Sequence, residues 1–87
     1  MTPAEAQALA DIRGYALAGR IELSPHAEER MRERHVTYED LRCALTGATN
    51  CRARPEDRWR VEGSDSEGDE LSVVVVIEDG VVVVTLF

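Results

Sequence analysis

The sequence predicts an α+β fold in which three N-terminal helices pack on one face of a four-stranded antiparallel sheet. Up to about residue 47, apolar residues recur with a helical period of about 3.6, and afterwards they alternate with the period of two that is typical of strands. Near the end of the chain, two β-branched runs flank Asp79-Gly80, a dipeptide that favours a tight hairpin turn. Helices followed by strands, without alternation of the two, indicate an α+β fold.

The first helix is predicted to begin after Thr2. Thr2 and Glu5 have the spacing of a capping box, and Pro3 occupies the first helical position, where a missing N–H is tolerated. Apolar residues follow at helical spacing as far as Gly19, where the helix is expected to end. Residues 21–23 form a short extended segment before the next helix.

Two further helices are predicted between residues 24 and 47. Ser24 is the expected N-cap of the second helix, again with proline in the next position. His35 is expected to end this helix in a left-handed conformation, which histidine tolerates better than most residues do. Thr37 is the expected cap of the third helix, which Gly47 is expected to end.

The four strands are predicted to form two hairpins. The first joins residues 50–54 to residues 58–62 through a turn at residues 55–57. The second joins residues 71–78 to residues 81–87 through a two-residue type I′ turn.

The type I′ turn would fix the register of the second hairpin. Val76 is then expected opposite Val83, and Val74 opposite Thr85. One face is wholly apolar and should pack on the helices: Val73, Val75, Ile77, Val82, Val84 and Leu86. The other face is too apolar to remain in solvent, which predicts contact with a subunit or partner chain. Its apolar residues are Val74, Val76, Val81, Val83 and Phe87.

Length and composition predict a single domain over residues 1–87, with a helix at 1–19 and a toxin-like α+β core at 20–87. No apolar run is long enough for a bilayer and the first residues lack the pattern of a signal peptide, so a cytoplasmic protein without membrane contact is expected. Cys43 and Cys51 have no partners at metal-binding spacing. We therefore expect reduced thiols, no metal and no other cofactor.

The net charge of -7 argues against a general nucleic-acid binder, but its distribution is uneven. Residues 26–60 carry eight arginines and seven acids, whereas residues 61–87 carry seven acids and no base. All ten basic residues are arginine, whose forked guanidinium suits phosphate or carboxylate. The middle of the chain is therefore suited to binding an anion locally.

The second helix carries a distinctive segment, SPHAEERMRER, at residues 24–34. His26, Arg30 and Arg34 recur every fourth residue, which places them along one side of the helix. The segment resembles the Ser/Thr-x-His-Ala-x-x-Arg-Met-x-x-Arg hallmark of a family of small bacterial proteins known as a domain of unknown function, and the resemblance extends over residues 20–87.

That family is similar to the RelE/MqsR-like toxins of toxin–antitoxin pairs. The resemblance implies a RelE- or barnase-like fold and a metal-independent ribonuclease that a protein antitoxin holds inactive. His26, Arg30, Arg34 and Thr85 match the toxin scheme by position. We therefore expect His26 to act as general base or acid, Arg30, Arg34 and one of Arg58 or Arg60 to stabilise charge on the phosphorane, and Thr85 to orient the phosphate. The candidate RNA-binding residues are the arginines of the first hairpin: Arg52, Arg54, Arg58 and Arg60.

Each of these residues also has a structural interpretation. His26 would pack against the start of its helix, and Arg30 and Arg34 would form ion pairs with Glu33 or Glu28. The hairpin arginines would form a solvated outer face, and Thr85 would be an ordinary strand residue.

A second functional hypothesis is therefore a non-catalytic protein-binding or dimerisation module that uses the valine-rich C-terminal sheet. The expected partners are an antitoxin of zinc-finger or helix-turn-helix type, or a second copy bound through the C-terminal strands, with RNA as the substrate in the enzymatic case.

Overall fold

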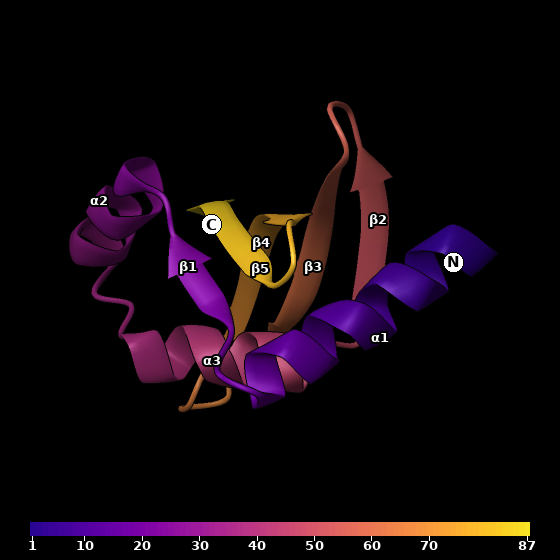
Figure 1. Cartoon of the computed structure of the whole chain (residues 1–87). Helices are drawn as coiled ribbons and strands as arrows, with labels where there is room; N and C mark the ends of the chain where they lie inside the picture. The colour runs from indigo at the N-terminus through magenta and orange to yellow at the C-terminus, as the bar shows by residue number, and fades with distance from the viewer.

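The computed structural model describes residues 1–87 and contains three helices and one five-stranded sheet (Figure 1). The helices are α1 (Pro3–Leu17), α2 (Pro25–Arg34) and α3 (Tyr38–Thr46). The strands are β1 (Ile21–Leu23), β2 (Asn50–Arg54), β3 (Arg58–Ser64), β4 (Glu70–Ile77) and β5 (Val81–Leu86). Their order in the sheet is β1-β5-β4-β3-β2, and β1 is parallel to β5 while the other pairs are antiparallel.

The prediction of a four-stranded antiparallel sheet was wrong, because the segment after α1 adds a fifth, parallel strand. The Val81 N–H donates to the Arg20 carbonyl over 2.9 Å, and the Ser24 N–H donates to the Val83 carbonyl over 3.0 Å. These bonds hold β1 along the free edge of β5. A strand of three residues is too short to show alternation, so only the tertiary structure assigns it to the sheet.

The predicted helix caps are confirmed. Thr2 and Glu5 form a reciprocal capping box, and the Ser24 hydroxyl accepts a hydrogen bond from the Ala27 N–H. His35 ends α2 in the left-handed region, with φ 54° and ψ 39°. Thr37 caps α3 through a second capping box.

Helices α1 and α3 pack against each other and against the sheet, as Figure 1 shows with both lying across one side of the strands. Helix α2 instead packs on β5 and β1 at the end of the sheet. Eighteen buried hydrophobic residues form one cluster with contributions from all three helices. None of the helices has the length and apolarity needed to cross a membrane.

The first hairpin has the predicted strands and turn, and Arg54 lies opposite Arg58. The second hairpin does not have the predicted register. Its strands are joined by a three-residue loop instead of a type I′ turn, so Ile77 lies opposite Val81 and Val75 opposite Val83. Asp79, with φ 53°, and Gly80, with φ 139°, carry the positive dihedral angles of this loop.

The additional loop residue exchanges the faces of β5. Val81 and Val83, predicted to point outward, are buried, whereas Val82 and Val84, predicted to be core residues, are half-buried. A bulge at Val84 then restores the expected pairing of Val74 with Thr85 and returns Leu86 to the core. The outward face of the second hairpin therefore keeps the predicted Val74 and Val76 of β4, but on β5 it is made by Val82 and Val84 instead of Val81 and Val83.

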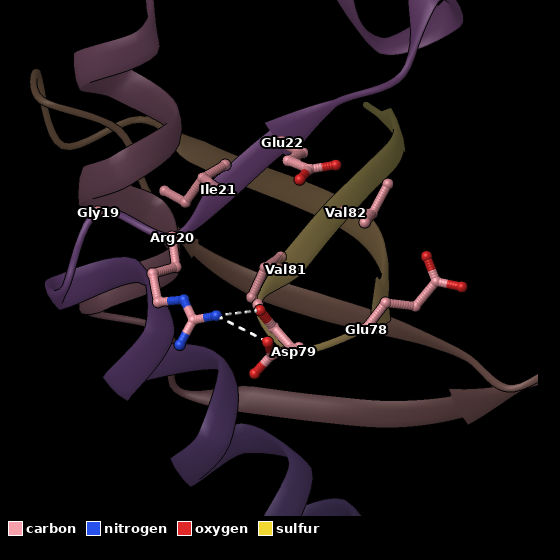
Figure 2. Close-up of a pocket in the computed structure, with 9 residues that line it drawn as sticks. Gly19, Arg20, Ile21, Glu22, Glu78, Asp79, Val81 and Val82 are labelled. Atoms are coloured by element: carbon pink, nitrogen blue, oxygen red, sulfur yellow. Dashed lines mark hydrogen bonds and ion pairs between the residues drawn. The ribbon is translucent and has the colours of Figure 1, made fainter.

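Contacts across the chain hold the loop at residues 78–80 in place. The Arg20 guanidinium donates to the Asp79 carbonyl over 2.7 Å and forms a 3.0 Å ion pair with its carboxylate (Figure 2). A β-carbon at Gly80 would lie 3.2 Å from the Arg20 carbonyl oxygen, so this backbone approach favours glycine.

Candidate functional site

The four candidate RNA-binding arginines lie on one face of the β2–β3 hairpin. Arg52 is paired with Arg60, and Arg54 with Arg58, as directly opposite residues. Opposite residues in an antiparallel pair project to the same side of the sheet, and side chains alternate along each strand. Cys51 and Val61, between these positions, are buried. The arginines therefore occupy the face opposite to the core, which we call the open face.

Most of the charge on these arginines is not balanced within the chain. Arg58 forms a 3.6 Å ion pair with the exposed Glu56, whereas Arg52, Arg54 and Arg60 take part in no ion pair. Like charges directly opposite each other on two strands destabilise a sheet. The open face is therefore electrostatically suited to an anionic ligand.

Arg60 makes a contact of a different kind. Its guanidinium lies over the Phe87 ring, 4.9 Å from the ring centroid, which is a cation–π geometry. Its Nε is buried and has no hydrogen-bond partner. Phe87 itself remains 45% exposed. Phe87 was predicted to face outward, but its contact with Arg60 was not predicted, because the extra loop residue and the bulge that set the end of β5 have no clear sequence signal.

The structure brings Thr85 to the same face as the arginines. Thr85 pairs with Val74 on β4, and Val74 pairs with Arg60 on β3. A pocket of about 260 Å³ is lined by both Thr85 and two arginines. Its lining residues are Arg54, Pro55, Glu56, Arg58, Val74 and Thr85. Two guanidinium groups and a hydroxyl around one small hollow are a suitable donor set for a phosphate group.

The other candidates, on α2, are less closely gathered. Arg30 is half-buried, and its Nε and Nη2 donate to the Leu86 carbonyl over 3.3 and 3.2 Å. It also forms a 3.5 Å ion pair with Glu33, as its structural interpretation expects. Arg30 therefore ties α2 to the residue that follows Thr85.

His26 and Arg34 are exposed at the two ends of α2 and line none of the pockets. His26 lies in the first turn, one turn or about 6 Å before Arg30. His35 is nine residues further along, about 13 Å from His26 along the helix axis. The two histidines are therefore too far apart to act on one phosphate as an acid–base pair.

The two thiols are poorly suited to nucleophilic chemistry. Burial raises the pKa of Cys51 to about 11, and Glu5 acts in the same direction. Burial also raises the pKa of Cys43, together with its hydrogen bond to Glu39. No cluster of three or more histidine, cysteine or carboxylate side chains has the geometry of a metal site.

The comparisons with known proteins match one family. A family model described as a domain of unknown function, DUF4258, matches residues 23–87, about three quarters of the chain. The matched region includes α2, α3, strands β2 to β5 and all the candidate residues above. No curated protein and no solved structure matches the chain.

Proposed function

We propose that this chain, which belongs to the DUF4258 family, is a toxin-like ribonuclease whose open face binds the RNA backbone. The observation that carries the proposal is the pocket shared by Arg54, Arg58 and Thr85. These residues come from three different strands and all offer hydrogen-bond donors. A phosphate in this pocket would be held by Arg54, the Thr85 hydroxyl and Arg58, which would exchange its ion pair with Glu56 for the phosphate, while Arg52 and Arg60 would contact neighbouring phosphates.

The proposed reaction is cleavage by the ribose 2′-hydroxyl. His26 takes the proton of this hydroxyl, and the 2′ oxygen then attacks the adjacent phosphorus. The arginines stabilise the negative charge that develops on the phosphorane, and Thr85 orients the phosphate. The 5′ oxygen leaves with a proton from solvent. Arg30 is assigned a positioning role, because its guanidinium already binds the Leu86 carbonyl and Glu33.

Two features of the structure support His26 as the base. It lies one helical turn from Arg30, and Arg30 binds the carbonyl next to Thr85, so the start of α2 is fixed relative to the pocket strand. The Ser24 hydroxyl adds a second link, because it donates to the Val84 carbonyl over 3.0 Å. The imidazole is also exposed and free to meet a bound strand. The regulatory partner of the enzyme would be an antitoxin protein.

The test is cleavage of end-labelled single-stranded RNA by purified protein in EDTA. His26→Ala should slow cleavage by about a hundredfold or more, the scale of general acid–base catalysis. His35→Ala is the matched control, since it removes an exposed histidine from the other end of α2 and should change the rate little. Equal rates for wild type and His26→Ala would remove His26 from the mechanism, and an inactive wild type would refute the enzymatic proposal.

A further inference from the structure

The open face is divided into three chemically distinct bands across the sheet. Arginines occupy β2 and β3, valines occupy β4 and β5, and the acidic Glu22 lies on β1. One row of paired residues crosses all three bands in order: Arg54, Arg58, Val76, Val82 and Glu22. We call these the arginine band, the valine band and the acidic band. The row changes from positive to negative through an apolar centre.

The acidic band consists of Glu22 on β1; Glu78, just beyond the end of the central strand β4, lines the same pocket as Glu22. Figure 2 shows both side chains pointing to the same side as Val82, whereas Ile21 points the other way and Arg20 points toward Asp79. Neither carboxylate takes part in an ion pair or a side-chain hydrogen bond, and Arg20, which lines the same pocket, is paired with Asp79. The acidic band is therefore as unbalanced within the chain as the arginine band.

The valine band between them is incompletely covered. Val74, Val76, Val82 and Val84 are all half-buried, and none belongs to the core cluster. Burial of such apolar area contributes about 25 cal/mol per Å². A partner that covers the valine band and places opposite charges over the arginine and acidic bands would bury the valines and pair the charges at the same time.

We propose that the partner is a second copy of this chain, packed face to face about a two-fold axis that runs along β4. Rotation about this axis places Val76 of one copy over Val76 of the other. It also places β2 of each copy over β1 of its partner, with Arg54 above Glu22 and Arg58 above Val82, while Glu78, at the end of β4, comes near Glu78 of the other copy. A two-fold interface uses the same patch on both copies, so each complementary contact occurs twice. A row that is positive at one end and negative at the other is self-complementary under this operation.

The size of the face indicates a weak dimer. Five strands spaced about 4.8 Å apart make the open face about 24 Å wide, and about five residues of about 3.3 Å rise make it about 16 Å long. The area of the face is therefore about 400 Å² per copy. Stable complexes bury about 800 Å² per partner. We therefore expect a reversible dimer that forms at high protein concentration and dissociates when salt screens the ion pairs.

This inference does not depend on ribonuclease activity, although it involves the same arginines. A second copy and an RNA strand would both cover the arginine band and would exclude each other. Self-association would then reduce the amount of protein available to RNA, and RNA would dissociate the dimer.

The test is sedimentation velocity over a concentration series, with two charge-reversal variants. Glu22→Arg and Arg54→Glu should each raise the dimer dissociation constant by about tenfold or more, because each substitution replaces attraction with repulsion at two symmetric contacts. An equimolar mixture of the two variants should associate again. In the mixed dimer the two reversed charges face each other at one contact, and the native Arg54 and Glu22 face each other at the second.

The controls reverse the same charges elsewhere. Glu67→Arg, in the loop after β3, and Arg13→Glu, on α1, change the net charge equally but lie outside the open face, so dimerisation should be unchanged. A wild-type protein that remains monomeric at about 0.5 mM, a dimer unaffected by Arg54→Glu, or a mixture that fails to associate would each overturn the proposal.

The same experiment separates this proposal from the enzymatic one. His26→Ala removes the proposed base and leaves the open face intact, so it should dimerise as the wild type does while RNA cleavage slows by about a hundredfold or more. A wild-type protein that cleaves RNA but stays monomeric would refute the dimer alone. A wild-type protein that dimerises but does not cleave RNA would refute the ribonuclease alone.

Discussion

Arg52 and Arg60 face each other across β2 and β3, and neither forms an ion pair with a carboxylate. Two like charges in this arrangement lower the stability of a sheet by an amount comparable to a favourable pair, about 0.2–1 kcal/mol. The next opposite pair, Arg54 and Arg58, repeats the arrangement. The protein therefore retains an electrostatic cost on its open face, which an anionic ligand or partner would relieve.

Removing two of these charges should weaken RNA binding in a salt-dependent way. Arg52 and Arg54 are exposed and form no ion pair, so the double variant Arg52→Ala/Arg54→Ala should fold normally. The slope of log affinity against log salt should fall by about 0.7 for each phosphate of a single strand that the variant no longer binds. Fluorescence anisotropy with labelled RNA measures this slope. Arg13→Ala serves as control, and an unchanged slope in the double variant would exclude these two residues from RNA contact.

Val82 and Val83 should respond oppositely to a charge. Val83 is fully buried, so Val83→Asp places an unpaired carboxylate in the core and should cost about 4 kcal/mol or more, enough to unfold much of the protein. Val82 is half-buried on the open face, so Val82→Asp should leave the fold intact. Circular dichroism and urea unfolding of the two variants test this difference. A folded Val83→Asp protein would contradict the register of β5, in which Val83 points into the core.

Gly63 and Gly14 form a second contrasting pair. A β-carbon at Gly63 would lie within 2.9 Å of the carbonyl carbon of Ala44, so α3 and β3 would have to separate. Gly63→Ala should therefore destabilise the protein by about 1–3 kcal/mol. Gly14 lies within α1 and nothing surrounds its β-position, so Gly14→Ala should stabilise by about 0.5–1 kcal/mol. Thermal denaturation of both variants distinguishes close packing from helix propensity, and equal effects would refute this explanation.

Asp40 should make stability depend on pH in acid. Hydrogen bonds from the Ser66 hydroxyl and the Thr37 N–H lower the pKa of Asp40 from 3.8 to about 2. Since the folded pKa lies below the unfolded one, the contribution is complete above about pH 4 and is lost as the pH falls toward about 2. Ser66→Ala should flatten the decline in stability over this range. Urea unfolding at several pH values measures the decline in the free energy of unfolding, and Ser64→Ala is the control. A decline that Ser66→Ala does not change would show that this hydrogen bond does not control the titration of Asp40.

The elements that local chemistry specifies could be predicted from the sequence. Thr2, Ser24 and Thr37 place a hydroxyl at the start of each helix, and His35 accepts the left-handed angle that ends α2. Alternation within residues 50–62 was sufficient to predict the first hairpin and the shared face of its arginine pairs, because side chains along a strand repeat every two residues.

Which distant residues meet depends on the tertiary structure instead. Residues 21–23 were predicted to be extended, but a strand of three residues has no periodic signal, so its pairing with β5 was missed, and with it the acidic end of the open face. A single additional loop residue turned Val81 and Val83 into the core, and the bulge at Val84 then returned Thr85 and Leu86 to their predicted faces. The run of four valines fits either register, so the sequence could not distinguish them. The pocket between Thr85, Arg54 and Arg58 arises from this register, because hydrogen bonding between strands fixes which side chains become neighbours and a uniform valine sequence does not.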